Sequence, residues 1–175
     1  MIKKIVLKIK ALYKALFWKA EKYARHQGVK IGKGCSIRTR DFGSEPYLIT
    51  IGNNVEIAAR VRFYNHGAAW LLRDVDENFD FFGKINIGDN VYIGENSIVL
   101  PGVTIGNNVL VGAGSVITKS FPDNAVIGGN PAKIVGQIES FREKYKLFNV
   151  GTKRLDREEK KKILLGLPDD RFIKK

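Results

Sequence analysis

The sequence predicts an all-β repeat fold, a parallel β-helix, because aliphatic residues recur at every sixth position and glycine and asparagine recur between them. The aliphatic positions at successive steps of six are Ile87, Ile93, Val99, Ile105, Val111 and Ile117. Ile51, Ile57 and Phe63 lie on the same count, and Ile31 and Ile37 form an earlier pair. In an α-helix, side chains six residues apart would be spread around every face, so this repeat excludes a helical structure.

A short strand followed by a corner fits this period. The aliphatic side chain points inward from each flat face, and glycine or asparagine supplies the unusual dihedral angles of the corner. Three faces close one coil of about 18 residues, and the coils stack at the ordinary strand spacing of about 4.8 Å. We therefore expect a β-helix over residues 29–136.

The N-terminal segment, residues 1–28, is expected to contain an amphipathic helix over about residues 2–24. Its apolar face consists of Ile2, Ile5, Val6, Ile9, Leu12, Tyr13, Leu16 and Ala20, and lysines cover the other face. The helix either covers the open end of the β-helix or lies on an anionic membrane surface. The sequence leaves both alternatives open.

Residues 64–84 interrupt the repeat without changing its count, because Phe63 and Ile87 are 24 residues apart. The interruption is polar and aromatic, and long loops inside compact repeats are often functional, so we expect an active-site loop. After Gly136 the repeat ends. The tail, residues 137–175, is expected to form short charged helices over 138–147 and 154–166.

The net charge of +12 is concentrated at the two ends of the chain. Residues 1–30 carry +8, residues 31–136 carry −1 and residues 137–175 carry +5. A nucleic-acid-binding protein would carry its basic stripe across the folded body, so we expect no nucleic-acid partner. The single cysteine excludes a disulfide framework, and lysines interrupt any signal sequence, so a cytoplasmic protein is expected. If the N-terminal helix lies on a membrane, the location is its inner face.

Two segments carry a resemblance to a known family. Residues 87–136, which include GAGSVITK and GGNPAK, and residues 42–66, which include SEPYLITIG, resemble the hexapeptide-repeat acetyltransferases, and within them the capsular and surface-polysaccharide O-acetyltransferases. The resemblance covers about residues 30–136. It implies a left-handed coil, a homotrimer, acetyl-CoA as donor, a sugar or glycan hydroxyl as acceptor, and active sites between subunits.

Acetyl transfer to a hydroxyl requires a general base, and histidine suits this role at neutral pH. Of the two histidines, His26 follows the basic helix, whereas His66 opens the interrupting loop where the resembling family carries its base. Many relatives carry an acid immediately after this histidine, but here the residue is Gly67. Glu45 is the first candidate to orient the ring in its place, and Asp74 is the second. Cys35 occupies a small inward position, so direct attack by the acceptor is preferred to an acyl-enzyme.

The remaining candidate site residues fall into two groups, and no metal site is expected. The acceptor group consists of Asn65, Glu45, Trp70, Asp74 and Tyr92. The resemblance implies that acetyl-CoA is held by Gly94, Gly112, Ala113, Thr118, Lys119 and Lys133.

Several other functions use the same coil. A zinc carbonic anhydrase needs three histidines and is excluded. O-acetylation of an antibiotic of the streptogramin or chloramphenicol type, and N-acetylation of a nucleotide-linked amino sugar, remain as alternatives. A structural β-helix without enzymatic activity is the non-enzymatic alternative.

Overall fold

The computed structural model describes residues 6, 13–14 and 16–174 of the chain. The chain divides into two compact units, residues 1–138 and 139–175, and each is described by itself. Among the described residues, no helix combines the length and hydrophobicity that crossing a lipid bilayer requires.

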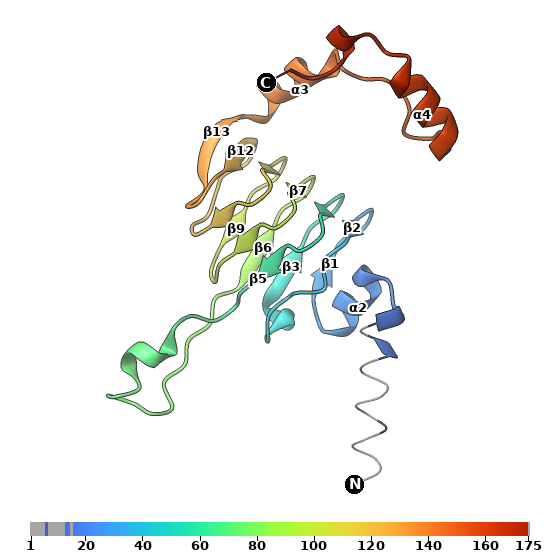
Figure 1. Ribbon diagram of the computed structural model, residues 1–175. Coiled ribbons are helices and arrows are strands. Elements are labelled where there is room, and N and C mark those ends of the chain that lie inside the picture. The colour runs from blue at the N-terminus through green and yellow to red at the C-terminus, as the bar shows by residue number, and fades with distance from the viewer. Residues whose placement is uncertain (1–5, 7–12, 15, 175) are drawn as a thin grey trace. The chain divides into compact units, whose positions relative to one another are not determined.

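The first unit consists of short strands that wind through three sheets, and each middle coil contributes one strand to every sheet (Figure 1). The first sheet contains β1 (Lys30–Ile31), β3 (Ile49–Ile51), β6 (Ile85–Ile87) and β9 (Thr104–Ile105). The second contains β2 (Ser36–Ile37), β4 (Glu56–Ile57), β7 (Tyr92–Ile93), β10 (Leu110–Val111), β12 (Ala125–Gly128) and β13 (Lys133–Gln137). The third contains β5 (Arg62–Phe63), β8 (Ile98–Val99) and β11 (Val116–Ile117). All pairs are parallel except β12 with β13, so the predicted parallel β fold is confirmed.

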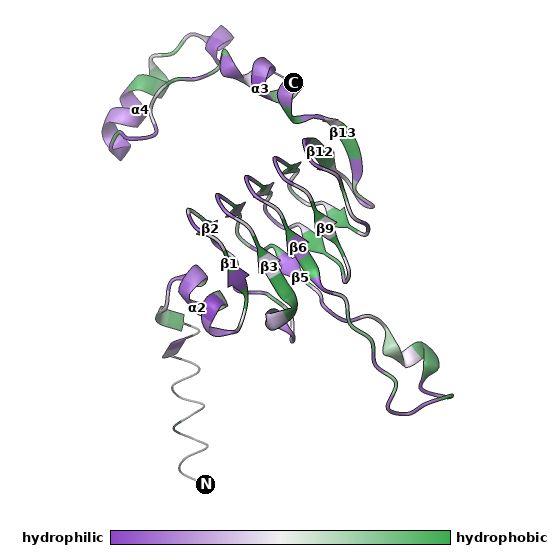
Figure 2. Cartoon of the chain, turned by 180° about the vertical axis from the view of Figure 1, so that it is seen from behind, coloured by the Kyte–Doolittle hydropathy of each residue, from purple (hydrophilic) through white to green (hydrophobic). Residues whose placement is uncertain are grey.

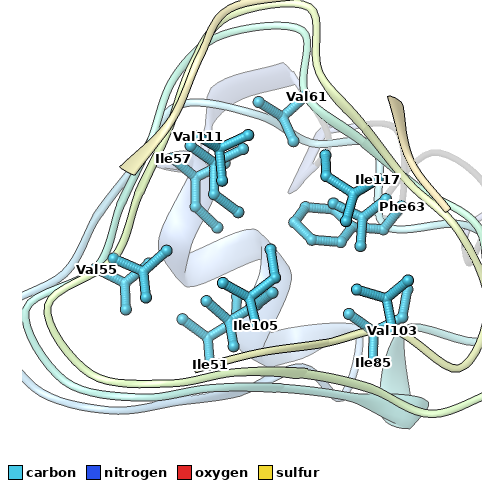
Figure 3. Packing of buried hydrophobic residues seen from close by; sticks show 14 of the residues in the cluster. Ile51, Val55, Ile57, Val61, Phe63, Ile85, Val103, Ile105, Val111 and Ile117 are labelled. Carbon is cyan, nitrogen blue, oxygen red and sulfur yellow. The ribbon is translucent and has the colours of Figure 1, made fainter. Parts of the chain in front are cut away.

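The hexad positions of the sequence meet one another inside the coil. Ile51 pairs with Ile87 and Ile87 with Ile105 in the first sheet, and Phe63 pairs with Val99 in the third. The side chains of Ile51, Phe63 and Ile105 converge on the axis of the coil in Figure 3, and all five paired residues are buried. The small residues four positions later, such as Val55 and Val61, fill the space between them. The core is therefore a stack of nearly identical layers.

The corner between the first and second sheets is held by two ladders of polar side chains. Asn54, Asn90, Asn108 and Asn124 all have a positive φ, and each amide donates to the next one along the stack at 3.1–3.3 Å. The second ladder joins side-chain oxygens to backbone N–H groups of the preceding coil, as from Asn107 N–H to Asp123 Oδ1 at 2.8 Å. That hydrogen bond lowers the pKa of the Asp123 carboxyl. Asparagine tolerates the left-handed conformation and pairs with its copies, which explains its recurrence.

The predicted N-terminal helix is wrong in one respect, because it does not continue to residue 24. Trp18 and Lys19 are not helical, and a separate helix α2 (Ala20–His26) follows. The break has tertiary causes: the Trp18 carbonyl accepts a hydrogen bond from Arg40, and the Trp18 ring packs against His26. Ala24 of α2 is buried in the core cluster. Residues 2–5, 7–12 and 15 of the predicted helix lie outside the described residues.

The second unit contains most of α3 (Ile138–Lys146), then α4 (Arg157–Leu165) and the 3-10 turn η3 (Asp169–Arg171). Helix α4 begins at a capping box, in which the Asp156 side chain accepts from the backbone of Glu158 and Glu159. It ends at Gly166. None of the described residues in 139–174 is buried, so the core of the protein belongs to the coil.

Candidate active site

His66 lies where the chain leaves the coil and enters the insertion of residues 64–84. The two ends of the insertion pair with each other, since His66 forms an antiparallel bridge with Phe82 and the Gly83 N–H donates to the Asn65 carbonyl at 2.7 Å. The Phe82 ring meets the imidazole edge to face, with 6.3 Å between the ring centroids. This narrow neck holds the backbone of His66 at the end of the third sheet.

Glu45 and Ser44 reach His66 from the preceding coil, just before the 3-10 turn η1 (Pro46–Leu48). Glu45 Oε2 lies 3.0 Å from His66 Nδ1, and Ser44 Oγ lies 3.3 Å from the same nitrogen. The Glu45 side chain is 15% exposed, whereas that of His66 is 44% exposed. Among the described residues, no hydrogen bond reaches Nε2 of His66. The ring is therefore anchored through one nitrogen and presents the other to its surroundings.

A cavity of about 300 Å³ opens beside the imidazole. Its lining combines the two ends of the insertion with Glu45, and consists of Glu45, His66, Gly67, Ala68, Ala69, Trp70, Arg73, Asp80 and Phe82. The 3-10 turn η2 (Ala69–Leu72) supplies part of this wall, and Figure 2 shows hydrophobic ribbon along it. Sequence reasoning missed Arg73, Asp80 and Phe82. They lie 7 to 16 positions after His66 in an irregular loop, and no sequence pattern indicates that the loop folds back to the cavity.

Gly67 lies against the ring of Phe81. A Cβ atom at position 67 would lie 2.2 Å from that ring, so a larger residue requires Phe81 to move. A side chain at position 67 would therefore need the exposed Phe81 ring to turn aside. Glu45 contacts Nδ1 of His66 from the preceding coil.

The sequence-predicted acceptor residues are only partly brought together. Glu45 and Trp70 line the cavity with His66, whereas Asp74 is exposed and is not among the lining residues. Asn65 is fully buried, and neither atom of its amide has a hydrogen-bond partner. Tyr92 lies on β7 of the second sheet, pointing outward, on a different face of the coil from His66. One chain thus places Asp74 and Tyr92 outside the cavity wall.

The residues expected to hold acetyl-CoA lie on the later coils. Gly94 and Gly112 follow β7 and β10 at the same corner, where the Gly94 backbone approaches Ala113 so closely that a Cβ would lie 2.5 Å from the Ala113 nitrogen. Thr118 and Lys119 follow β11, on the side of the third sheet from which His66 emerges two coils earlier. Lys133 is exposed on β13.

The described residues contain no cluster of three or more metal-ligating side chains. The arrangement instead provides an oriented imidazole, an open cavity and exposed backbone corners. These parts suit proton transfer during attack by a hydroxyl group.

Comparisons with known proteins agree with this geometry. Residues 84–119 match the family model described as bacterial transferase hexapeptide (six repeats). Protein CapG of Staphylococcus aureus is 51% identical over 151 residues, which cover 84% of this chain and 88% of CapG. Galactoside O-acetyltransferase of Escherichia coli is 41% identical over 106 residues, covering 59% of this chain, which spans about half (51%) of that relative.

Among solved structures, the hexapeptide-repeat acetyltransferase VCA0836 of Vibrio cholerae, complexed with acetyl coenzyme A, superposes with a TM-score of 0.56 at 30% identity. The match covers 63% of this chain and 61% of VCA0836.

Proposed function

Because the chain belongs to the hexapeptide-repeat acetyltransferases, we propose that it moves an acetyl group from acetyl-CoA to a hydroxyl of a sugar or surface-polysaccharide precursor. The acetyl-CoA complex of VCA0836 supports the donor, and the galactoside O-acetyltransferase supports the class of acceptor. The resemblance of residues 42–66 to the surface-polysaccharide O-acetyltransferases favours a surface polysaccharide as the destination of the sugar.

The observation that carries the catalytic proposal is the contact between His66 and Glu45. With Nδ1–H donating to the Glu45 carboxylate, Nε2 keeps a lone pair, and the residue itself lines the cavity. A carboxylate in this position fixes the tautomer and stabilises the imidazolium that forms during the reaction. Glu45 is thus a positioning residue for the base.

The proposed reaction is a direct transfer in two bond-changing steps. Nε2 of His66 takes the proton of the acceptor hydroxyl while the hydroxyl oxygen attacks the thioester carbonyl, which gives a tetrahedral oxyanion. The carbon–sulfur bond then breaks, the acetyl ester remains on the sugar, and the CoA thiolate receives the proton from His66. No acyl-enzyme forms, and Cys35, whose thiol donates to the Gly52 carbonyl, has a packing role.

We place the donor in a groove between subunits of a homotrimer of left-handed coils. Gly94, Gly112 and Ala113 lie at the corner between the second and third sheets, whereas His66 leaves the far end of the third sheet. A corner of one chain set beside the His66 side of its neighbour would bring donor and base together. The outer surface of the third sheet carries the aliphatic side chains of Ile98 and Val116, which suit such an interface.

The proposed location is the cytoplasm, at the inner face of the membrane, with residues 2–24 as the contact. Val6, Tyr13, Leu16 and Phe17 are all exposed, and the surrounding segment carries the largest positive charge of the chain. Apolar side chains on a basic segment favour an anionic bilayer surface. Sedimentation with phosphatidylglycerol vesicles but not with phosphatidylcholine vesicles is expected, and Phe17→Glu should weaken it. Equal recovery with both vesicles would contradict this location.

The function is tested by acetyl-CoA turnover with a panel of monosaccharides, nucleotide sugars and antibiotics. Wild type is expected to acetylate a sugar hydroxyl, and His66→Ala should lose at least about 100-fold in rate, as removal of a general base does. Calorimetry should show unchanged acetyl-CoA affinity in the variant. Turnover with an antibiotic alone would favour the second enzymatic candidate, and unchanged turnover by the variant would remove His66 from the mechanism.

A further inference from the structure

The wall of the cavity beside His66 includes a positively charged side chain that has no partner in the described part of the chain. Arg73 lines the cavity, and none of the hydrogen bonds or ion pairs among the described residues involves its guanidinium. The other charged side chains of the wall are engaged: Glu45 contacts His66, and Asp80 Oδ1 accepts from the Phe81 N–H at 2.9 Å. Arg73 is the charged group of the wall that remains available to a ligand.

Two arginines of the coil that lie outside this cavity are tied to neighbours, whereas Arg38 is exposed and has no side-chain hydrogen bond or ion pair among the described residues. Arg60 donates to Asn96 Oδ1 at 2.8 Å and pairs with Glu95, and Arg62 lies 3.6 Å from the Asp41 carboxylate. Such pairs explain Arg60 and Arg62 by structure alone. Arg73 differs from these two because it has no such pair, and from Arg38 because it lines the cavity beside His66, on an exposed turn directly after η2.

Two exposed aromatic rings flank the same space. Trp70 is 76% exposed and Phe82 is 50% exposed, although both line the cavity. Large rings exposed at the wall of a cavity offer apolar surface to the C–H faces of a sugar. The cavity therefore presents a base, two ring surfaces and a free guanidinium within about 300 Å³.

We infer that the acceptor is an anionic sugar, whose carboxylate or attached phosphate is bound by Arg73 while Trp70 and Phe82 contact the ring. This inference rests on the proposed function and specifies its substrate class. A guanidinium matches either anion through two parallel N–H···O hydrogen bonds, which a neutral sugar cannot offer. Asp80 in the same wall repels an anion, so the charged group is directed to the Arg73 side.

The test compares matched acceptors with wild type, Arg73→Gln and Arg73→Lys. The acceptors are p-nitrophenyl glucoside (neutral), p-nitrophenyl glucuronide (carboxylate) and UDP-glucose (phosphate). Wild type is expected to prefer at least one anionic acceptor by about 10-fold or more in kcat/KM. Arg73→Gln should reduce that ratio by about 10-fold, Arg73→Lys should reduce it less, and the preferred anion distinguishes the two sources. Arg38→Gln changes an exposed arginine outside this cavity and should leave the ratio unchanged.

A ratio near one in wild type, or a ratio that Arg73→Gln does not alter, would overturn the inference while sugar acetylation stands. Failure of every sugar as acceptor would count against the proposed function instead. Binding then decides the inference: titration with glucuronate and with inorganic phosphate should shift the Trp70 indole resonance, assigned with Trp70→Phe, in wild type but not in Arg73→Gln. No shift with either anion in wild type would overturn it.

Discussion

At the scale of single residues, the arrangement around His66 rests on a carboxylate that the sequence places 21 positions earlier. Glu45 holds Nδ1 at 3.0 Å, and Ser44 is a second, longer contact at 3.3 Å. Glu45→Gln preserves shape but removes the charge that stabilises the imidazolium, and its amide can also present the wrong group to Nδ1. We expect kcat to fall by at least about 10-fold, with the KM for acetyl-CoA unchanged.

Ser44→Ala is the matched control for this substitution, because it removes the other partner of the same nitrogen without removing a charge. Its effect on kcat should be clearly smaller than that of Glu45→Gln. Equal losses in the two variants, or a loss that appears in KM alone, would show that Glu45 does not position the base.

Gly67 and Phe81 show where residue-level reasoning from the sequence succeeds and where it stops. The sequence indicates that an acid is missing after His66 and directs attention to Glu45, which the structure places at the ring. The Phe81 ring, which belongs to the other end of the insertion, lies close to Gly67 and limits the space for a side chain there. Arg73 and Asp80 join the cavity in the same way, and no periodicity reports the path of an irregular loop.

At the scale of elements, the corners between sheets depend on both backbone and side chain. Asn90 has a φ of 57° and its side chain bridges Asn54 and Asn108. Asn90→Gly keeps the conformation and removes the side-chain ladder, whereas Asn90→Ala removes the ladder and also places alanine in the left-handed region. We expect both to destabilise the protein, and the alanine variant to be about 1 kcal/mol less stable than the glycine variant.

Urea unfolding followed by circular dichroism measures this difference. Thr104→Ala, on the outer surface of β9, is the control and should change stability by less than about 0.5 kcal/mol. An alanine variant as stable as the glycine variant would show that the corner imposes no conformational demand.

The strands of the coil could be predicted because every coil needs the same residue types at the same positions, with an aliphatic side chain inside each face. The spacing of Ile87, Ile93 and Val99 alone predicts the sheet to which each belongs. The structure pairs them with the equivalent residues of the preceding coil, as expected. The N-terminal helix could not be bounded in this way. Its break at Trp18 and Lys19 depends on Arg40 and His26, which are remote contacts that the helical pattern does not contain.

At the scale of the whole molecule, the proposed trimer makes the outer surface of the third sheet part of the enzyme. Ile98 points outward from β8, next to Val116 on β11. A buried charge without a partner is costly at an interface, so Ile98→Glu should lower the trimer content and reduce acetyl transfer together. Light scattering and turnover at matched concentrations measure the two effects.

Thr104→Glu introduces the same charge on the outer surface of the first sheet and should leave both properties unchanged. A monomeric wild-type protein with full activity would contradict the shared groove. An Ile98→Glu variant that remains trimeric but is inactive would also contradict the prediction, because the loss of activity would then not result from loss of the trimer.

The pairing of β3 with β6 and of β5 with β8 has a consequence for how this chain can change. The coil closes across the gap left by residues 64–84, so the part of the insertion beyond the neck of Asn65, His66, Phe82 and Gly83 does not take part in strand pairing. The length and sequence of that outer part can therefore change while the neck and the layers of the coil stay in place. A chimera that carries the corresponding loop of another acetyltransferase should keep its melting temperature and acquire the acceptor specificity of that enzyme.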